Sequence, residues 1–378
     1  MKKVRYAVVG AGQISQEAFM PAIAQTGNSE MTVIVSGSPD NAAKLADFYG
    51  IKHIFQYEQY DTMLAADLVD AVYIALPNAM HADYAVRAAK AGKHVLVEKP
   101  LATTEDECEA MIAAAAENGV FLMTAYRLHT EPGTLQVLEH IRSGRIGDPR
   151  IFTSVFSFLP VADNHRLDAA QWGGPLQDVG VYCLNAARHV FGAEPVEAMA
   201  VRSDGNGDQK FAGVGESIAV TLRFPEGRLA QFIASFGADT KDFYHVGGTK
   251  GSIFANPGFQ FEFATCIRMC RGDEVTEEEF VRTDQFAGQT AYFSDCILKG
   301  LNPEPDGAEG LSDVRALIAI ERAAQTGRPQ KIDSPARPVH PTIDMVRTLP
   351  PTERRLVFRS GRLAVTCDPH PRPLSGSS

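Results

Sequence analysis

The sequence predicts an α/β protein with two domains, in which a parallel sheet covered by helices precedes an α+β domain with a large, mostly antiparallel open sheet. The chain has 378 residues, enough for two domains at roughly 100 to 200 residues each. Through residue 125, short apolar runs alternate with amphipathic stretches, which is typical of βα repeats. Beyond residue 150, strand-like runs follow one another with few helices between them, which is typical of an antiparallel sheet.

The first 125 residues carry start and stop signals for helices between the strands. The helices are expected to begin near Ser15, Asn41, His81 and Thr104. The last of them opens with hydroxyl and acidic residues, and Asn118-Gly119 ends it. The predicted strands are Arg5–Val9, Met31–Ser36, a short one near Ile54, Ala71–Ala75, His94–Glu98 and Val120–Ala125.

The second region contains turn sequences that favour hairpins. Pro225-Glu226-Gly227 and the run 247–251 have turn chemistry, so neighbouring strands there are predicted to pair antiparallel. Helices are expected near Leu176–Phe191 and over Leu311–Gln325. The predicted strands are Arg150–Leu159, Val196–Arg202, Glu216–Phe224, Arg228–Gly237, Ser252–Phe254 and Phe259–Ile267.

The C-terminal end is rich in proline. Eight of the 22 prolines fall between Pro335 and Pro373, which predicts a flexible extension. We therefore expect a dinucleotide-type domain at 1–125, a substrate and oligomerisation domain at 126–332, and an extension at 333–378.

Composition and charge exclude several classes of function. The net charge is −10 and the basic residues form no block, so a nucleic acid partner is not expected. No apolar run approaches the roughly 20 residues that span a bilayer. The apolar run before Gly10 is too short for an export signal, which predicts a cytoplasmic protein. The six cysteines are dispersed, and Cys266-x3-Cys270 lacks further ligands at zinc-site spacing, so no metal is expected.

The first strand leads into a glycine turn. Gly10-Ala11-Gly12-Gln13-Ile14-Ser15 stands between this strand and a helix, which is the dinucleotide-binding arrangement of a Rossmann domain. Gly10 permits the tight turn and Gly12 the approach of a pyrophosphate, while N–H groups near Gln13 and Ile14 donate to it. A glycine turn without a ligand is the alternative.

The end of the second strand decides which dinucleotide is bound. An acidic residue there would hydrogen-bond the ribose of NAD, but this chain has Ser36-Gly37-Ser38. Hydroxyl and N–H groups can donate hydrogen bonds to a phosphate, so NADP(H) is favoured. NAD(H) stays possible because the nearest lysine, Lys44, lies well into the helix and Asp40 is close to the turn.

Polar residues follow the fourth and fifth predicted strands. Leu76-Pro77-Asn78 with His81, and Glu98-Lys99, lie at carboxyl ends of strands, where a nicotinamide would be expected. Asp178, Tyr182 and Asn185 have the i, i+4, i+7 spacing of one helix face. Ion-paired surface residues and a satisfied polar helix face are the alternatives.

These motifs together resemble the Gfo/Idh/MocA oxidoreductases over roughly residues 4–331. Within that family the chain is most similar to the glucose–fructose oxidoreductase branch, because Tyr182 stands where the inositol dehydrogenase branch has histidine. The motifs that carry the resemblance are the glycine turn, Leu76-Pro77-Asn78 with His81, Glu98-Lys99-Pro100, Ala125-Tyr126-Arg127-Leu128-His129, and the Gly-Gly-x-Leu-x-Asp-x-Gly-x-Tyr run at 173–182.

The resemblance implies a nicotinamide cofactor and a catalytic set of Lys99, Asp178 and Tyr182, with Tyr182 exchanging the proton of the substrate. A tyrosine has an ordinary pKa of about 10, too high for a base near neutrality, and a neighbouring ammonium lowers it. Lys99 is the candidate for that ammonium. The family's open sheet often mediates oligomerisation, so a homodimer or homotetramer is expected.

The predicted function is hydride transfer between NAD(P) and an aldose or related cyclic polyol. A trans-dihydrodiol dehydrogenase and a non-catalytic NAD(P)-binding regulatory protein are the alternatives. The residues expected at the cofactor are Gly10, Gly12, Gln13, Ile14, Ser36, Gly37, Ser38, Leu76, Pro77, Asn78, His81, Glu98, Lys99 and Arg127. Those expected at the substrate are Lys99, His129, Arg166, Asp178 and Tyr182.

Overall fold

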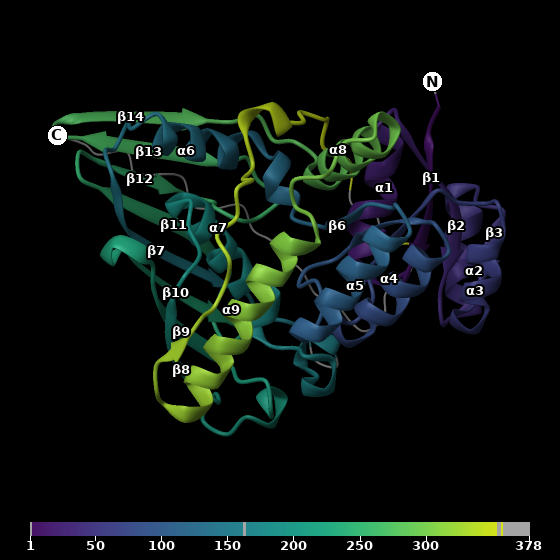
Figure 1. Cartoon of the computed structure of the whole chain (residues 1–378), viewed down its shortest axis with the longest axis horizontal. Coiled ribbons are helices and arrows are strands. Elements are labelled where there is room, and N and C mark those ends of the chain that lie inside the picture. Colours follow the sequence, from purple (N-terminus) through teal and green to yellow (C-terminus); the bar gives the residue numbers. More distant parts are fainter. Residues whose placement is uncertain (1, 162–163, 354–356, 358–378) are drawn as a thin grey trace.

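The computed structural model describes residues 2–161, 164–353 and 357. Its strands form a six-stranded sheet and a nine-stranded sheet. Figure 1 shows the two sheets at opposite ends of the molecule, with helices between them. The predicted α/β class, with a parallel sheet followed by a mostly antiparallel one, is confirmed.

All described strand pairs of the first sheet are parallel, in the order β3-β2-β1-β4-β5-β6. Because β2, β1, β4 and β5 are neighbours, their carboxyl ends lie side by side at one edge of the sheet. Most residues of β1, β4 and β6 are buried, as expected of a sheet covered on both faces. The strands are β1 (Val4–Val9), β2 (Ser29–Val35), β3 (His53–Phe55), β4 (Ala71–Ile74), β5 (His94–Val97) and β6 (Leu122–Thr124).

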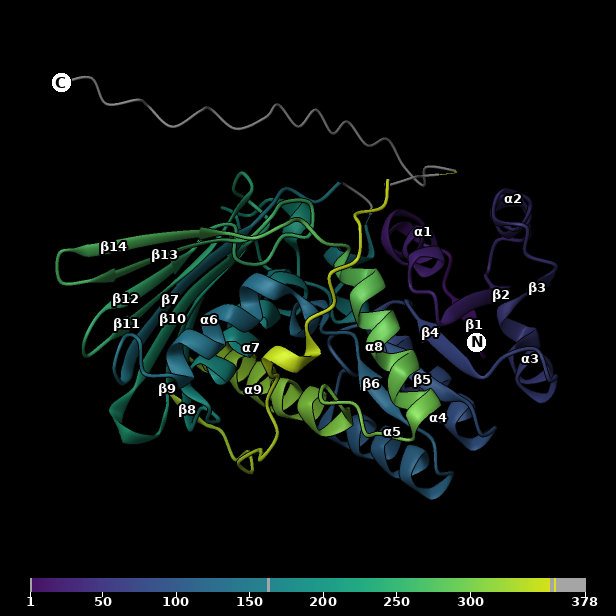
Figure 2. The ribbon, with the colours of Figure 1, turned by 90° about the horizontal axis from the view of Figure 1, so that it is seen from above.

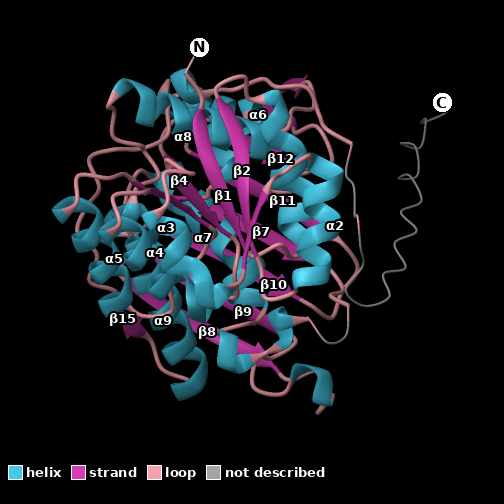
Figure 3. Cartoon of the chain, turned by 90° about the vertical axis from the view of Figure 1, so that its right-hand side faces the viewer, coloured by secondary structure: helices cyan, strands magenta, loops and turns pink. Residues whose placement is uncertain are grey.

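The four helices predicted for this half begin close to the expected positions. Thr104 caps α5 through a capping box, because its hydroxyl accepts from the Glu107 N–H at 3.2 Å and its N–H donates to the Glu107 carboxylate at 3.1 Å. Figure 3 shows the helices beside the strands of this sheet. They are a π-helical turn (Ser15–Phe19) that continues into α1 (Met20–Ala22), then α2 (Pro39–Tyr49), α3 (Tyr60–Ala65), α4 (His81–Lys90) and α5 (Glu105–Glu117).

The second sheet has the order β14-β13-β12-β11-β7-β10-β9-β8-β15, and its described pairs are antiparallel except β7–β10. Figure 2 shows α6 (Pro132–Arg142), α7 (Val181–Phe191) and α9 (Gly307–Thr326) packed between this sheet and the rest of the molecule. The strands are β7 (Pro149–Ser157), β8 (Glu197–Ser203), β9 (Ser217–Arg223), β10 (Leu229–Ser235), β11 (Lys241–Gly248), β12 (Ser252–Ala255), β13 (Cys266–Arg271), β14 (Glu274–Glu279) and β15 (Gln330–Lys331).

The predicted strand Phe259–Ile267 is wrong, because a strand begins only at Cys266. The N–H groups of Phe259 and Gln260 donate to the Asp242 carboxylate, both at 2.7 Å, instead of to a neighbouring strand. Among the described residues, the sequence did not predict α3, α6, β11, β14, α8 (Gln285–Lys299) or β15.

Helix α8 joins the two halves. It comes from the predicted second domain, yet its Ser294 hydroxyl is hydrogen-bonded to Tyr6 at 2.8 Å and to Ser29 at 2.7 Å, on β1 and β2. The Asn28 amide donates to the Ala291 carbonyl at 2.9 Å. The contacts place this helix on the first sheet, although it follows the strands of the second sheet in the chain.

Residues 333–353, here called the C-terminal strap, make specific contacts rather than standing free as expected. Arg337 lies 2.7 Å from a Glu309 oxygen, and the ring of His340 lies 3.2 Å from that of His189. Arg347 pairs with Asp295 on α8 at 3.5 Å. Residue 357 aside, the rest of the predicted extension lies outside the described residues. Within the described part of the chain, no helix has the length and apolarity to cross a membrane.

Candidate active site

Lys99 and Asp178 form an ion pair at the centre of the candidate site. Lys99 follows β5, and its ammonium donates to Asp178 Oδ1 at 3.0 Å and to the Asp178 carbonyl at 2.7 Å. Their side chains are only 10% and 18% exposed, so water screens the pair little. The structure thus joins two of the three residues predicted to be catalytic.

Arg166 holds the second oxygen of the same carboxylate, with Nε 2.8 Å from Asp178 Oδ2. Burial favours the neutral acid, but the cations Arg166 and Lys99 outweigh it and hold the pKa of Asp178 well below its ordinary value. Burial likewise disfavours the ammonium, but Asp178 and Tyr182 outweigh it and raise the pKa of Lys99. Both groups are therefore charged near neutral pH, which suits Lys99 to electrostatic stabilisation.

Tyr182, at the start of α7, lies beside two cations. Its ring centroid is 5.0 Å from the Lys99 nitrogen and 4.7 Å from the guanidinium carbon of Arg127. Phe156 and Phe259 pack against the ring at centroid distances of 5.8 and 6.3 Å and fix its orientation. Among the described residues its hydroxyl has no hydrogen-bond partner. Tyr182 is buried and does not itself line the pocket described below.

A small pocket opens beside the ion pair, between the two halves of the molecule. Asn78 and Lys99 enter it from the first sheet, and the other residues come from the segment that leads to α7. Gln171 and Gln177 were not singled out in the sequence, although Gln177 stands within the glycine-rich run at 173–182 and Gln171 lies shortly before it. The pocket is lined by Asn78, Lys99, His165, Arg166, Gln171, Gly173, Gly174, Gln177 and Asp178.

Trp172 connects the segment that leads to α7 with both halves of the molecule. Its backbone has a positive φ of 53°, which is strained for a bulky residue. Asn78 donates to its carbonyl at 3.0 Å, and its indole N–H donates to Glu321 on α9 at 2.9 Å. The two bonds hold the segment over the pocket.

The predicted polar helix face is only partly found. The chain runs through a π-helical turn, Leu176–Gly180, before α7 begins, so the spacing is not that of one continuous α-helix. Asp178 and Tyr182 both reach Lys99, whereas Asn185 points into the interior and donates to Glu309 at 2.8 Å and Asp313 at 2.9 Å.

The glycine turn fits a dinucleotide pyrophosphate. Gly10 has φ 94°, and a Cβ there would lie 2.6 Å from the Ala75 carbonyl, so only glycine fits. A Cβ at Gly12 would meet nothing within 4 Å, which leaves room for a ligand. The helix that follows has unpaired N–H groups in its first turn, at Gln13 and Ile14, and these suit an anion.

The other predicted cofactor residues line the same sheet edge. Ser36, Gly37 and Ser38 follow β2, and the Ser38 N–H donates to the Ser36 hydroxyl at 3.2 Å. A Cβ at Gly37 would lie 2.8 Å from the Tyr57 ring. No carboxylate stands directly after β2, so nothing in this turn repels a ribose phosphate.

His81 and Glu98 support the site from below the surface. The buried His81 ring lies 2.9 Å from the carbonyl oxygens of both Leu76 and Pro100, which joins the loops after β4 and β5. Glu98 accepts the Tyr73 hydroxyl at 2.7 Å, and burial raises its pKa. Pro77 precedes Asn78 at the pocket. These contacts fix the loops without showing a contact to the cofactor.

The structure does not bring His129 to the pocket. It is buried, with its ring nitrogens 2.7 Å from a Glu304 oxygen and 2.9 Å from the Asn185 amide oxygen. Arg127 is also buried and stacks on Tyr182, and its predicted contact with the cofactor stays a prediction. Both side chains are committed to the protein interior, so we do not propose His129 as a substrate contact.

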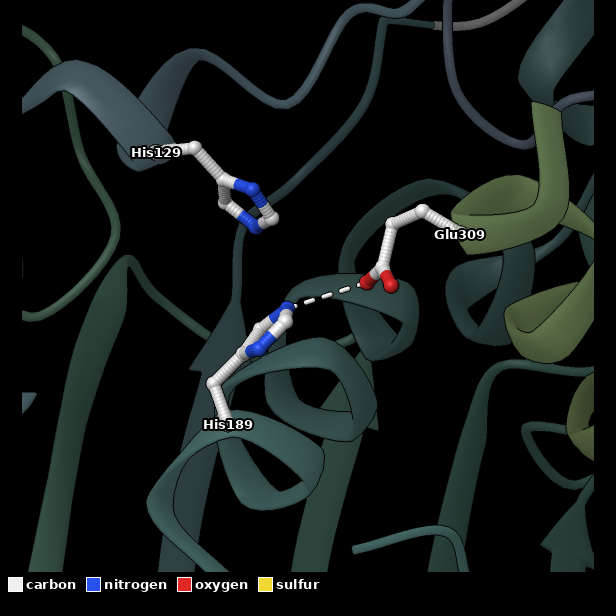
Figure 4. Close-up of side chains that lie close together, drawn as sticks. All are labelled: His129, His189 and Glu309. Atoms are coloured by element: carbon white, nitrogen blue, oxygen red, sulfur yellow. Dashed lines mark hydrogen bonds and ion pairs between the residues drawn. The ribbon is translucent and has the colours of Figure 1, made fainter. Parts of the chain in front are cut away.

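Figure 4 shows His129, His189 and Glu309 close together between α7 and α9. His189 lies 2.9 Å from Glu309 Oε1, and the two arginines Arg188 and Arg337 lie 2.8 and 2.7 Å from the same carboxylate. Two guanidinium groups already neutralise Glu309, and both nitrogens of His129 have partners. The cluster is thus better explained as an ion-pair network than as a cation site.

Comparison with known proteins places the chain in a family. A model of the oxidoreductase family with an NAD-binding Rossmann fold matches residues 4–126, and a model of the Gfo/Idh/MocA C-terminal domain matches residues 134–254. The NADP(+) D-xylose 1-dehydrogenase of Haloarcula marismortui is 33% identical over 87% of this chain and 93% of that protein. The chain belongs to the Gfo/Idh/MocA oxidoreductase family. It is therefore an oxidoreductase with an NAD-binding Rossmann domain, as the motifs predicted.

Two solved structures resemble most of this chain. The aldose-aldose oxidoreductase from Caulobacter crescentus, complexed with glycerol, has a TM-score of 0.83 and 35% identity over 88% of this chain and all of that one. A 3-ketoreductase from Actinomadura kijaniata, in complex with NADP and TDP-benzene, has a TM-score of 0.78 and 28% identity over 85% of this chain and 98% of that one. The relatives named here are dehydrogenases and reductases of sugars.

Proposed function

We propose that this Gfo/Idh/MocA enzyme transfers a hydride between NADP(H) and a secondary alcohol or hemiacetal carbon of an aldose or related cyclic polyol. The observation that carries the proposal is the Tyr182 hydroxyl, unpaired beside the Lys99–Asp178 ion pair. The named sugar dehydrogenases and reductases among the relatives support the substrate class.

Tyr182 is the proposed general acid and base. The bound nicotinamide supplies an acceptor or donor of hydride at the substrate carbon. In the oxidative direction the Tyr182 oxygen accepts the proton of the substrate hydroxyl, and in the reductive direction it returns it. The Lys99 ammonium stabilises the tyrosinate, and Asp178 holds Lys99 in place.

The preference for NADP(H) rests on the turn after β2. Ser36, Gly37 and Ser38 offer hydroxyl and N–H groups and no carboxylate, and the relatives include an NADP-dependent dehydrogenase and a reductase with NADP bound. The cytoplasmic location and the homo-oligomer stay predictions.

The proposal is tested by following absorbance of the reduced cofactor with the purified chain and a panel of aldoses, polyols and trans-dihydrodiols. NADP(+) is expected to be used at lower concentration than NAD(+), and an aldose is expected to be turned over. Tyr182→Phe should lower the single-turnover rate of hydride transfer about 100-fold or more, because general acid–base catalysis contributes roughly 10²- to 10⁴-fold.

Other results would favour the alternatives. Turnover of diols alone would indicate a dihydrodiol dehydrogenase, and cofactor binding with no turnover would indicate a regulatory protein. An unchanged rate in Tyr182→Phe would remove this residue from the mechanism. The affinity for the cofactor, measured by fluorescence, should be the same in the parent chain and in Tyr182→Phe.

A further inference from the structure

Arg127 is a buried cation without an acidic partner. It follows β6 and is 4% exposed. One guanidinium nitrogen donates to the Phe259 carbonyl at 2.6 Å, and the other to the Gln285 side-chain oxygen. In the described part of the chain, no carboxylate lies within ion-pair distance of it. Burying a charge with only neutral acceptors is costly, so the position calls for a compensating negative charge.

Two aromatic rings face the guanidinium. Its carbon lies 4.7 Å from the centroid of Tyr182 and 5.1 Å from that of Phe261. Both rings attract a cation through their π faces. Only Tyr182 can gain a full negative charge, which a phenolate shares between its oxygen and its ring. The attraction to Arg127 therefore grows when Tyr182 loses its proton.

The nearby carboxylates Asp242 and Glu98 interact with the charge of Arg127 but form no ion pair with it among the described residues. Asp242 accepts the N–H groups of Phe259 and Gln260, and burial raises its pKa. Desolvation likewise raises the pKa of the partly buried Glu98, and Asp178 is held by Lys99 and Arg166. The titratable and charged groups around the pair are Tyr73, Glu98, Lys99, Asp178 and Asp242.

We propose that Arg127 is a positioning residue for the proton transfer, whose guanidinium, stacked on the Tyr182 ring, stabilises the tyrosinate alongside Lys99. This inference rests on the proposed function. The substrate O–H bond breaks, its proton joins the Tyr182 oxygen, and the substrate carbon loses its hydride to the nicotinamide. Arg127 exchanges no proton itself, because a guanidinium stays protonated throughout the working pH range.

The test compares pH profiles of kcat/KM for aldose oxidation in the parent chain, Arg127→Met and Arg127→Lys. Without the cation the tyrosinate is less stable, so the rising limb should move to higher pH by about one unit in Arg127→Met. The rate at neutral pH should fall roughly 10-fold, since each unit is a factor of ten. Arg127→Lys keeps the charge and should restore most of the limb position.

A matched control is available where the C-terminal strap meets α8. Arg347 lies 5.7 Å from the Tyr292 centroid, away from the pocket, so Arg347→Met removes the same kind of contact and should leave the profile unchanged. If Arg127→Met does not fold, Gln285→Met is the second variant. This change removes the side-chain oxygen that accepts a hydrogen bond from Arg127. It should move the rising limb of the pH profile in the same direction by a smaller amount.

Three outcomes would overturn the inference. An unshifted limb in folded Arg127→Met would show that the guanidinium does not act on Tyr182. Equal losses in the Met and Lys variants would indicate a role in packing alone. Weaker NADPH binding with an unchanged profile would make Arg127 a cofactor contact. Retained hydride transfer in Tyr182→Phe would instead contradict the proposed function itself, so the two failures are distinguishable.

Discussion

Single residues in this chain owe their chemistry to neighbours that are distant in sequence. Asp178 was predicted to be catalytic from its motif, but its charge depends on Arg166 and on Lys99, 79 residues away. Arg166 was predicted as a substrate contact, and the structure shows it first as the partner of Asp178. The sequence predicted the residue types of the site, because a few local motifs carry them. It did not predict which of these residues form ion pairs with one another.

His189 gives a prediction for stability against pH. Burial lowers its pKa to about 4, below the ordinary value of about 6.5. As the pH falls through this window, the unfolded chain binds the proton first, so stability is lost. His189→Gln should remove this loss, and the free energy of unfolding should then fall roughly 1–2 kcal/mol less between pH 7 and pH 5 than in the parent.

Urea denaturation at both pH values measures the difference. The control is His53→Gln, because His53 is exposed on β3 and its replacement should leave the acid slope unchanged. If the free energy of unfolding falls equally between pH 7 and pH 5 in the parent and in His189→Gln, groups other than His189 govern the acid sensitivity.

At the scale of elements, the C-terminal strap completes a cluster that α7 and α9 begin. Glu309 on α9 is fully buried beside Arg188, and the strap adds Arg337 to the same carboxylate. The prolines of the strap predicted a flexible segment, because proline disfavours helices and sheets. They do not prevent a segment from binding through its side chains.

Arg337→Met should therefore destabilise the fold although it lies far from the pocket. The change leaves Glu309 with one guanidinium fewer, and breaking a buried ion pair costs about 3–5 kcal/mol. Since Arg188 remains, we expect a loss of roughly 2–4 kcal/mol in urea denaturation. Arg322→Met, on the exposed side of α9, is the matched control and should be neutral within about 0.5 kcal/mol.

At the scale of the whole molecule, the nine-stranded sheet leaves apolar side chains uncovered on the face opposite α6, α7 and α9. The largest exposed fraction is 74%, at Val201. Patches of this kind mark interaction surfaces, and they support the predicted homo-oligomer. The exposed apolar residues on β7, β8 and β10 are Ile151, Met199, Val201, Leu229 and Ile233.

Val201→Asp combined with Ile233→Asp should convert the oligomer to a monomer, because the charges would have to be buried unpaired in the interface. Light scattering after size exclusion measures the mass. Phe48→Asp, at an apolar residue on α2 that is about as exposed as Ile233, should leave the mass unchanged. A parent chain that is monomeric at micromolar concentration would contradict the prediction.

The sequence alone determined the first sheet, the glycine turn, the residue types of the site and the family. These features depend on local periodicity, caps and motifs, which a few consecutive residues specify. Only the tertiary structure decided that Arg127 stacks on Tyr182, that His129 is buried, that α8 covers the first sheet and that the strap reaches Glu309. Each of these outcomes depends on burial and on partners brought together by packing, and neither property is carried by neighbouring residues in the chain.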